Sequence, residues 1–346
     1  MAPKSRAAAR QQGQLQPVAF DYSGLEIGMR CQAESDGVYY AAEVVQVSTS
    51  RNRARAPVKV HFPGYESTWD TWIGGEQLRS KALKRSAPAN RAPAEAAAVA
   101  REPRPKIEMK PNTVVIVSTS AAYLKGHQTG LWLEELASPY YKFKEAGFEV
   151  VIASARGGPV PIDAASMKGD DFTAAAKKFM LDGDAFGDLS HSIRLNAIDF
   201  KSDTIKAVFV CGGHGACADF IKSPVLKKAI ETVYGAGNAV AAVCHGLICL
   251  AQCKKPDGSP LVKDLIVTGF SESEEDAVKL ADKVPFAIES KLKELGGLYE
   301  KGEDWSCTVK VAGNLITGQN PQSSEGCADA VIKATKEIEA ARIAGA

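Results

Sequence analysis

The sequence predicts an α/β domain, built on a doubly wound parallel sheet with a nucleophile elbow, and a small all-β barrel ahead of it. After residue 110, short apolar strands alternate with helical stretches, which is the pattern of a parallel sheet covered on both faces. Between residues 22 and 80, short β-rich runs are broken by turn residues, as in a small barrel or a strongly bent sheet. The chain is therefore expected to hold two domains of different class.

Composition excludes several classes of protein. The 346 residues are 45% hydrophobic and 24% charged, which is ordinary for a globular protein. No apolar run reaches the ~18 residues that span a bilayer, so no membrane association is expected. Without a secretory signal, the eight cysteines indicate a reduced protein that is cytoplasmic or nuclear. The basic residues 1–20 are expected to form a disordered tail, with an organelle-targeting segment as the alternative.

Charge divides the chain into a basic part and an acidic part. Residues 1–110 hold 17 basic and 11 acidic side chains, whereas the rest of the chain holds 25 and 30. The expected segments are a basic tail (1–21), a small β domain (22–81), an Ala/Pro/Arg-rich linker (82–110) and a catalytic domain (111–346). The basic and acidic domains are expected to meet different partners.

The expected elements follow from local residue patterns. In the small domain, strands are predicted at 38–40, 43–47 and 58–62, with Asp36-Gly37 as a hairpin turn. In the large domain, strands are predicted at 114–117, 150–153, 207–210, 239–243 and 265–267. Helices are predicted at 131–146, 216–234, 245–253, 285–295 and 324–342, and an edge hairpin at 308–311 and 315–317.

Cys244 is the predicted nucleophile. It directly follows the apolar strand 239–243 and precedes a helix that starts near His245. This strand–turn–helix arrangement raises the thiol above the carboxyl ends of the strands, where sites in open α/β sheets lie. It also places the thiol at a helix N-terminus, where the dipole favours the thiolate. Most of the other cysteines are expected to be small buried apolar residues.

A glycine-rich turn follows the preceding predicted strand. Gly212-Gly213-His214-Gly215 would let the backbone approach a substrate closely. A glycine N–H of this turn and the N–H of His245 could together form an oxyanion hole. Gly212, Gly213 and His214 are therefore predicted to bind substrate.

The identity of the general base stays open on residue pattern alone. The chain has five histidines and none follows His245, so an amidotransferase-type site with a distant downstream histidine is excluded. The candidates are His245, His214 and His127. A carboxylate must orient the base, and the acids of residues 271–276 lie at the right edge of the sheet. Most of these acids are expected to be solvated charges at the start of a helix, and at least one could orient the base. A second source of carboxylates is a predicted helix start at residues 131–139, where Glu134 is expected to be a surface residue.

Neither a nucleotide cofactor nor a metal ion is expected. No Gly-x-Gly-x-x-Gly follows a strand, so a bound dinucleotide is not indicated. The cysteines form no Cys-x-x-Cys pair, and no histidine set completes a zinc site at the usual spacing.

Five sequence strings resemble the ThiJ/PfpI superfamily, which has the class I glutamine amidotransferase-like, flavodoxin-like fold. They are similar to the heat-shock glyoxalase III branch and stand in family order at 130–140, 212–215, 242–246, 268–270 and 317–321. The resemblance implies Cys244 as nucleophile, His245 as its catalytic partner and Glu275 as the triad acid. It also implies Glu135 as the acid that faces the thiol, with Gly213 and the His245 backbone holding the oxyanion.

The resemblance also implies a reaction and a set of partners. The expected activity is a cofactor-free lyase of the D-lactate dehydratase type, which converts methylglyoxal, a small 2-oxoaldehyde, to D-lactate without glutathione. Members of the branch are also credited with chaperone, peptidase and protein-deglycating activities, and family members often form homodimers. The alternative hypothesis is a chaperone or a redox sensor that uses Cys244.

Residues 26–80 resemble the Tudor-knot or chromo-barrel module, at strings 27–31, 38–42, 61–65, 69–73 and 78–80. In members that bind methylated lysine, four aromatic residues form a cage for the ammonium group. The corresponding residues here are Tyr40, Phe62, Tyr65 and Trp69. Two alternatives remain. The aromatic residues could fill the barrel core, or the barrel could bind nucleic acid through Arg51, Arg53, Arg55 and residues 79–85.

Overall fold

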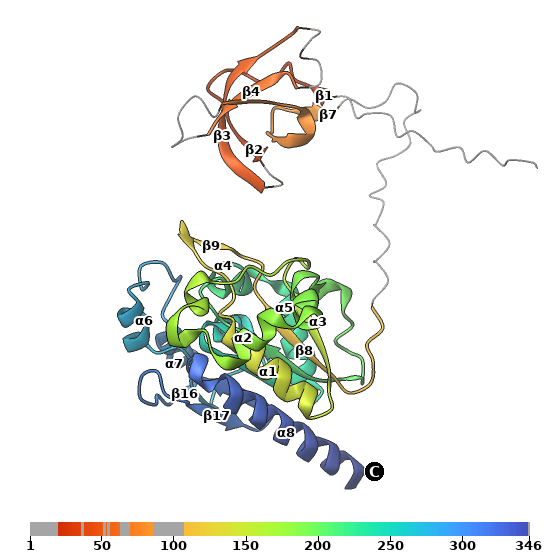
Figure 1. The fold of residues 1–346 in the computed structure, drawn as a ribbon, viewed down its shortest axis with the longest axis vertical. Helices are drawn as coiled ribbons and strands as arrows, with labels where there is room; N and C mark the ends of the chain where they lie inside the picture. Colours follow the sequence, from red (N-terminus) through yellow and green to blue (C-terminus); the bar gives the residue numbers. More distant parts are fainter. Residues whose placement is uncertain are drawn as a thin grey trace, which may run out of the picture. The chain divides into compact units, whose positions relative to one another are not determined.

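The computed structural model describes residues 20–35, 38–50, 53, 56–62, 70–85 and 107–344. The chain divides into two compact units, residues 1–100 and residues 101–346 (Figure 1). The predicted turn Asp36-Gly37, the basic residues Arg51 and Arg55, and most of the predicted tail and linker lie outside the described residues. Each unit is described by itself.

The small unit contains a five-stranded antiparallel sheet in the order β5-β4-β3-β2-β6. The strands are β2 (Arg30–Ser35), β3 (Val38–Val47), β4 (Val58–His61), β5 (Thr71–Ile73) and β6 (Leu78–Arg79). A short helical turn, η3 (Gly75–Gln77), precedes β6, and β1 (Phe20–Asp21) pairs with β7 (Lys84–Arg85) as a separate ribbon. Residues 20–21 and 82–85 therefore extend this unit beyond the expected bounds of 22–81.

Alternating side chains build the core of the small unit. Ala42 and Val44 of β3 face Val58 and Val60 of β4, and all four are buried. The strands β2 and β3 pair from Arg30↔Glu43 to Ser35↔Val38, which is the predicted hairpin. The all-β character of the unit is as predicted. In the hydrogen-bonded order β5 and β6 lie at opposite edges, so the closed barrel stays a prediction.

The large unit is built on a seven-stranded sheet in the order β12-β11-β8-β13-β14-β18-β17. The strands are β8 (Thr113–Ser118), β11 (Glu149–Ser154), β12 (Ile193–Arg194), β13 (Ile205–Val210), β14 (Ala239–Val243), β17 (Val309–Ala312) and β18 (Leu315–Gly318). All pairs are parallel except β17–β18, the predicted edge hairpin. From the central β8 the chain moves first to one side and then to the other, so the sheet is doubly wound and its switch point lies between β8 and β13.

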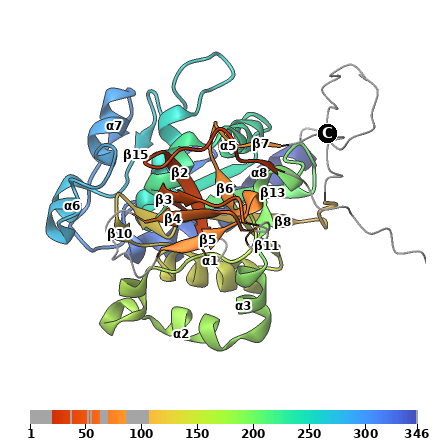
Figure 2. The ribbon, with the colours of Figure 1, turned by 90° about the horizontal axis from the view of Figure 1, so that it is seen from above.

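Helices cover the two faces of this sheet (Figure 2). α1 (Glu134–Glu145) connects β8 to β11, and α5 (Pro224–Gly235) connects β13 to β14 in the opposite direction, so right-handed crossovers place them on opposite faces. The last helix, α8 (Ser324–Ala344), packs against α1. Among the described residues, no helix combines the length and the apolar character needed to cross a membrane.

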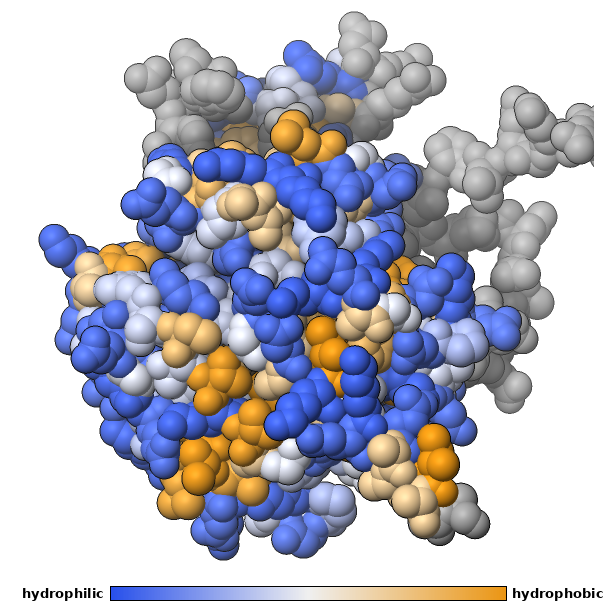
Figure 3. Space-filling model, turned by 60° about the horizontal axis from the view of Figure 1, so that its bottom comes forward, coloured by the Kyte–Doolittle hydropathy of each residue, from blue (hydrophilic) through white to orange (hydrophobic). Residues whose placement is uncertain are grey.

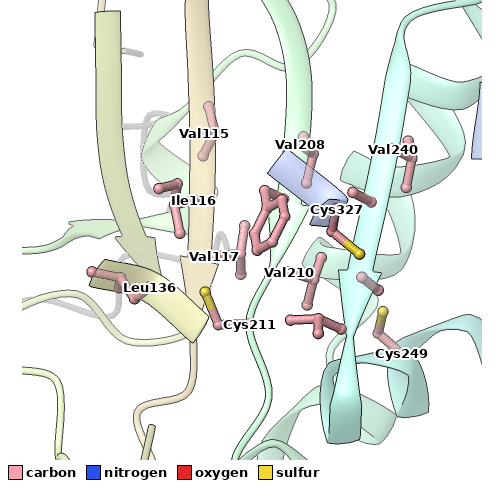
Figure 4. Close-up of a cluster of buried hydrophobic side chains, with 14 of the residues drawn as sticks. Val115, Ile116, Val117, Leu136, Val208, Val210, Cys211, Val240, Cys249 and Cys327 are labelled. Atoms are coloured by element: carbon pink, nitrogen blue, oxygen red, sulfur yellow. The ribbon is translucent and has the colours of Figure 1, made fainter. Parts of the chain in front are cut away.

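The strands are apolar because both of their faces are buried. All six residues of β8 and all five of β14 are buried, which explains their nearly unbroken apolar sequence. Figure 4 shows Val115, Ile116 and Val117 beside Val208 and Val210, with three cysteine side chains filling gaps in the same core. The core therefore fixes the carboxyl ends of β13 and β14 as a rigid edge.

Several predicted elements need correction. The predicted strand at 265–267 forms as β15 (Ile266–Val267), but it pairs with β16 (Leu298–Tyr299) outside the main sheet, because β18 occupies the place beside β14. The predicted helix 216–234 is divided into α4 (Ala216–Asp219), a turn η7 (Phe220–Lys222) and α5, since Pro224 can only begin a helix. The predicted helix 245–253 is a 3-10 helix, η8 (Cys244–Gln252).

Elements that the residue patterns did not predict surround the sheet. They are the ribbon β9 (Tyr123–Leu124) and β10 (His127–Gln128), the helices α2 (Ala174–Leu181) and α3 (Gly183–Ser190), and the short turns η4 (Ala164–Met167), η5 (Gly169–Asp171), η6 (Leu195–Ala197) and η9 (Pro321–Ser323). The helix α6 (Glu272–Val278) begins at the helix start expected within residues 271–276. Of the predicted helix 285–295, α7 (Ile288–Glu294) is formed. In the predicted linker, Ile107 donates its N–H to the Ala197 carbonyl and so joins the large unit.

Some large apolar side chains remain at the surface of the large unit. Ile266, Leu298 and Val311, on β15, β16 and β17, are 42%, 55% and 55% exposed. Figure 3 shows hydrophobic groups gathered among hydrophilic ones on one face of the molecule. Nothing in the structure shows what covers these side chains, so the expected homodimer stays a prediction.

Candidate active site

Cys244 lies at the turn between β14 and η8, at the carboxyl end of the sheet. Its backbone has φ 56°, a left-handed conformation that costs free energy for any residue other than glycine. The turn packs closely against the end of β13, since a Cβ on Gly246 would lie 2.6 Å from the Val210 carbonyl oxygen. The strained backbone and the tight contact together form the predicted nucleophile elbow.

The glycine turn after β13 reaches this elbow because its residues carry no side chain. Gly213 has φ 83°, and a Cβ there would lie 2.3 Å from the carbonyl oxygen of Gly130. A Cβ on Gly212 would lie 2.7 Å from the His245 nitrogen. Both positions therefore require glycine.

Glu275 holds two histidines beside the thiol. The Nδ1 atom of His245 lies 3.3 Å from the Cys244 Sγ, and its Nε2 atom lies 2.7 Å from Glu275 Oε2. The other oxygen of the carboxylate, Oε1, lies 2.8 Å from the Nε2 atom of His214. The two imidazole rings are 3.9 Å apart between centroids. A Cys–His–Glu arrangement with a second histidine on the same carboxylate results.

A capping box places Glu275 at the start of α6. The Ser271 side chain accepts the N–H of Glu274, and the Glu274 carboxylate accepts the N–H of Ser271. The second oxygen of Glu274 accepts hydrogen bonds from the amides of Gln319 and Asn320. Glu274 is thus buried in a structural network rather than solvated as expected for most acids of this segment, and Glu275 is the acid that reaches the site.

Glu135 lies in the first turn of α1 and is fully buried. Its Oε2 atom accepts the Gly212 N–H at 2.6 Å, whereas its Oε1 atom has no hydrogen-bond partner among the described residues. Burial raises the pKa of this carboxyl to about 8, against the opposing effects of the Gly212 hydrogen bond and of the Cys244 thiol. Glu135 is therefore an acid that holds its proton near neutral pH.

The neighbouring Glu134 differs from the surface residue that was expected. It is partly buried and accepts a hydrogen bond from the Thr173 hydroxyl. Burial raises the pKa of its carboxyl. Thr173 caps α2, so Glu134 links two helices and does not face the thiol.

The resting form of Cys244 also differs from the expected thiolate. Burial raises the pKa of this thiol well above its ordinary value, and the Glu135 carboxyl beside it acts in the same direction. The backbone N–H groups of His245 and Gly213 lower the pKa of the thiol but do not compensate for burial. The sulfur is therefore a thiol at rest and needs a base.

His245 is available as that base. Burial is the largest effect on its imidazole and lowers the pKa to about 4. Burial alone would raise the pKa of Glu275, but the hydrogen bonds from His214 and His245 outweigh it and lower that pKa to about 2. At neutral pH the site holds an ionised Glu275 and a neutral His245.

A pocket of about 290 Å³ opens onto these groups. It is lined by Trp132, Asp171, Gly213, His214, Cys244, His245, Phe270, Val278, Trp305, Pro321 and Gln322. The Nε1–H of Trp132 is buried, and among the described residues it has no hydrogen-bond partner. The pocket combines aromatic walls with a few polar groups, as small-molecule sites do.

The structure brings together most of the predicted site residues. Glu135, Cys244, His245 and Glu275 meet, and the backbone N–H groups of Gly213 and His245 interact with the sulfur. Their role as an oxyanion hole stays a prediction. Gly212 is a correction, because its N–H is already donated to Glu135.

His127 is the candidate base that does not reach the site. It lies on β10, away from the pocket, and makes no hydrogen bond to Cys244 or Glu275.

Some site residues were missed by residue pattern. Trp132 lies within the string 130–140, and Phe270 ends the string 268–270, so their positions were visible although their role was not. Phe270 lies 4.3 Å from the His245 ring between centroids. Asp171 ends the short turn η5 and Trp305 lies in the loop before β17, and no sequence signal indicated a site at either position.

Glu275, His214 and His245 are also the group with metal-binding potential among the described residues. Their ligand atoms lie within 4.8 Å of one another. Both imidazoles already share hydrogen bonds with the carboxylate, so a metal ion would have to replace two protons.

The predicted cage of the small unit falls largely outside the described residues. Tyr65 and Trp69 are not described, and neither is the side chain of Tyr40. Phe62 is partly buried and packs against the core of the unit. Arg53, from the predicted nucleic-acid surface, stacks on Trp72 at 4.3 Å from the ring centroid. Both proposed ligands of this unit remain predictions.

Comparison with known proteins gives the family. The model of the DJ-1/PfpI family matches residues 128–334, which include the elbow, the glycine turn and both catalytic carboxyl candidates. The chain belongs to the DJ-1/PfpI family. The resemblance inferred from the five sequence strings is thereby confirmed at the level of the family.

Named relatives of this DJ-1/PfpI domain include glyoxalases. A glutathione-independent glyoxalase of Schizosaccharomyces pombe is 30% identical over 230 residues, covering 61% of this chain and 91% of that protein. Among solved structures, the Rapid Encystment Protein 24 KDa of Francisella tularensis is 33% identical with TM-score 0.61, covering 65% of this chain and 99% of that one. Glyoxalase III of Candida albicans is 27% identical with TM-score 0.59, covering 64% and 96%.

Proposed function

We propose that the large unit is a glutathione-independent glyoxalase that converts methylglyoxal and water to D-lactate. The observation that carries the proposal is the arrangement of Cys244, His245 and Glu275 around a small pocket, with the protonated Glu135 beside the sulfur. The glyoxalase names of relatives from two yeasts support it. In the terms of enzyme classes the activity is that of a lyase.

The first step is addition of the thiol to the aldehyde. The Cys244 sulfur forms a bond to C1 while His245 takes the thiol proton, and the π electrons of the C1 carbonyl move to its oxygen. The N–H groups of Gly213 and His245 stabilise this oxyanion, which then takes a proton to give a hemithioacetal. The site stabilises negative charge where it develops, and Glu275 holds the imidazolium in place.

The second step moves hydrogen from C1 to C2. A base removes the C1 proton, either Glu135 or His245 once it has given its own proton to the oxyanion. The electron pair of the broken C–H bond forms a C1–C2 double bond, and the C2 oxygen takes a proton to give an enediol. C2 then takes a proton while a base of the site removes the C1 hydroxyl proton, so that the C1 carbonyl forms again, now as a thioester. C1 is oxidised and C2 is reduced within the same molecule, so the reaction needs no external redox partner.

The third step releases the product. Water adds to the thioester carbonyl, the carbon–sulfur bond breaks, and the sulfur regains its proton. The same oxyanion hole serves this addition, because the charge develops on the same C1 oxygen. The pocket then holds lactate and the original thiol.

The small unit is proposed to be a recognition module that directs the enzyme. A cage formed by Tyr40, Phe62, Tyr65 and Trp69 would bind a methylated lysine tail. Trp69→Ala in the full chain is expected to abolish binding of a trimethyl-lysine peptide in a calorimetric titration. Binding that survives the substitution contradicts the cage and leaves nucleic acid as the partner to test.

The alternative function is that of a chaperone, redox sensor, deglycase or peptidase of the same superfamily. A buried cysteine that a pocket opens to solvent suits oxidation as well as catalysis. Sensing alone does not require a buried acid such as Glu135 beside the thiol, and this acid favours the enzyme.

The test is turnover by the purified full chain. Methylglyoxal is expected to disappear and D-lactate to form with the natural protein, and both rates are expected to fall to background with Cys244→Ala. A stereospecific enzymatic assay of D-lactate distinguishes the product from L-lactate. Equal rates for the natural protein and the variant contradict the proposal.

A further inference from the structure

We propose that His214 is a second general base, which transfers the substrate's carbon-bound proton while His245 serves the thiol. The proposal rests on the glyoxalase function and assigns the proton transfer from C1 to C2 to a specific group. It adds to the Cys–His–Glu set a histidine that shares the same carboxylate and lines the same pocket.

The two imidazoles are held in equivalent ways. Each directs its Nε2 atom at one oxygen of Glu275, at 2.8 Å from His214 and 2.7 Å from His245. A carboxylate can only accept, so each ring carries its proton on Nε2 and leaves Nδ1 as an acceptor. Glu275 therefore sets the same tautomer in both rings.

The two Nδ1 atoms face different reaction partners. The Nδ1 atom of His245 lies 3.3 Å from the Cys244 sulfur and is committed to the thiol proton. The Nδ1 atom of His214 makes no hydrogen bond to any described residue, and His214 lines the pocket. An imidazole acceptor without a protein partner, on a residue that lines a substrate pocket, is suited to take a proton from the substrate.

A division of labour follows from proton balance. When the thiol adds to the aldehyde, His245 becomes an imidazolium and cannot accept a second proton until it has given up the first. His214 removes the C1 proton, the electron pair of the broken C–H bond forms the C1–C2 double bond, and the C2 oxygen takes a proton. His214 later returns a proton to C2. Glu275, which stays ionised, stabilises each imidazolium in turn, because each donates to one of its oxygens.

The role of His214 is distinct from that of Glu135. Glu135 lies beside the sulfur and accepts the Gly212 N–H, so it neighbours the thiol side of the substrate. His214 lines the pocket, and among the described lining residues the other side chains that could take a carbon proton are His245 and Asp171. We therefore assign Glu135 to the oxygen protons and His214 to the carbon proton.

The decisive variant is His214→Gln, whose amide can still donate to Glu275 but cannot accept a proton as a base. Turnover of methylglyoxal in the full chain is expected to fall about 10²-fold or more in kcat, as is typical of a lost general base. The rate at which iodoacetamide alkylates Cys244 is expected to stay within about twofold, since the thiol keeps His245. His127→Gln, on β10 outside the pocket, is the matched control and is expected to match the natural protein in both assays.

A second variant covers the case in which His214→Gln fails to fold. His214→Ala leaves space for a free base, so added imidazole is expected to restore turnover in proportion to its concentration. Imidazole is expected to have no effect on Cys244→Ala. The same assays in D2O, followed by proton NMR of the lactate C2 position, show whether the carbon proton is still transferred.

Three outcomes separate the possibilities. Unchanged kcat in His214→Gln overturns the inference and leaves the glyoxalase function standing. Equal losses of turnover and of thiol alkylation, without rescue by imidazole, also overturn it, because His214 then acts only through the Cys–His–Glu set. Failure of the natural protein to turn over methylglyoxal removes the proposed function itself.

Discussion

The ends of β13 and β14 offer a comparison between two cysteines in nearly the same surroundings. Cys211 directly follows β13, and Cys244 directly follows the adjacent parallel strand β14. Both thiols are buried, and burial raises the pKa of each well above its ordinary value. Glu135 lies close enough to raise both pKa values further. Burial and charge therefore do not distinguish the two sulfurs.

The hydrogen-bond partners do distinguish them. Cys211 donates its S–H to the backbone carbonyl of Glu135 at 3.2 Å. That carbonyl is vacant because Pro139, four residues later in α1, has no N–H to donate to it. Cys211 thus completes the hydrogen bonding of a helix that contains a proline. Its thiol has a structural task.

The backbone conformation also differs between the two turns. Cys244 has a positive φ, whereas Cys211 does not. The strained turn points the Cys244 sulfur toward His245 and the pocket instead of into the helix beside it. Burial alone therefore does not distinguish the two thiols, and the hydrogen-bond partner and the backbone conformation are what support Cys244 as the proposed nucleophile.

The largest expected effect is on thiol reactivity. Iodoacetamide is expected to alkylate Cys244 about 10³-fold faster than Cys211 in the native protein, because Cys211 is closed off from solvent and has no base. Mass spectrometry of the labelled peptides after timed quenching measures both rates in one sample. Cys244→Ala is expected to leave the slow labelling of Cys211 unchanged. Comparable rates for the two thiols would show that the hydrogen-bond partner and the backbone conformation do not make Cys244 the more reactive cysteine.

The central strands could be predicted from the sequence because burial on both faces leaves a simple apolar signature. β8, β11, β13 and β14 lie within two residues of their predicted bounds. The helices α2 and α3 could not be predicted in the same way. They are short and begin with the caps Thr173 and Asp182, and contacts such as Phe179 with the Tyr140 ring stabilise them, so they depend on the assembled fold.

The site shows the same division between local and long-range signals. The elbow at Cys244 could be recognised because a strand, a turn and a helix are adjacent in the sequence. The bond from His214 to Glu275 joins residues 61 positions apart, so it depends on how β13 and α6 meet. Glu274 looked like a solvated acid because its partners Gln319 and Asn320 follow β18, more than 40 residues later.

The next largest effect concerns Glu135 and the pH dependence of stability. Its folded pKa, about 8, lies above the ordinary value of 4.5, so unfolding releases a proton between these two pH values. The stability from the buried neutral acid is present below about pH 4.5 and is lost as the pH rises through about 8. Between pH 5.5 and pH 8, the natural protein is expected to lose about 3 kcal/mol more unfolding free energy than Glu135→Gln.

Urea unfolding at both pH values measures this difference. Glu272→Gln, at an exposed position in the first turn of α6, is the control and is expected to follow the natural protein. Parallel curves for the natural protein and Glu135→Gln would show that Glu135 is already ionised in the folded state. The acid would then be no proton donor for the thiol.

The smallest expected effect separates the two turns by backbone strain alone. At position 244 a glycine adopts the positive φ without steric cost, so Cys244→Gly is expected to be about 1 kcal/mol more stable than Cys244→Ala. At position 211 the opposite is expected: Cys211→Ala should be more stable than Cys211→Gly by about 0.5 to 1 kcal/mol, because glycine there only adds entropy to the unfolded chain. Chemical unfolding of the four variants gives the two differences directly. Because both variants of a pair remove the same thiol, the lost side-chain contacts largely cancel in the difference. If the alanine variant is the more stable one at position 244 as well as at position 211, the elbow at Cys244 stores no strain.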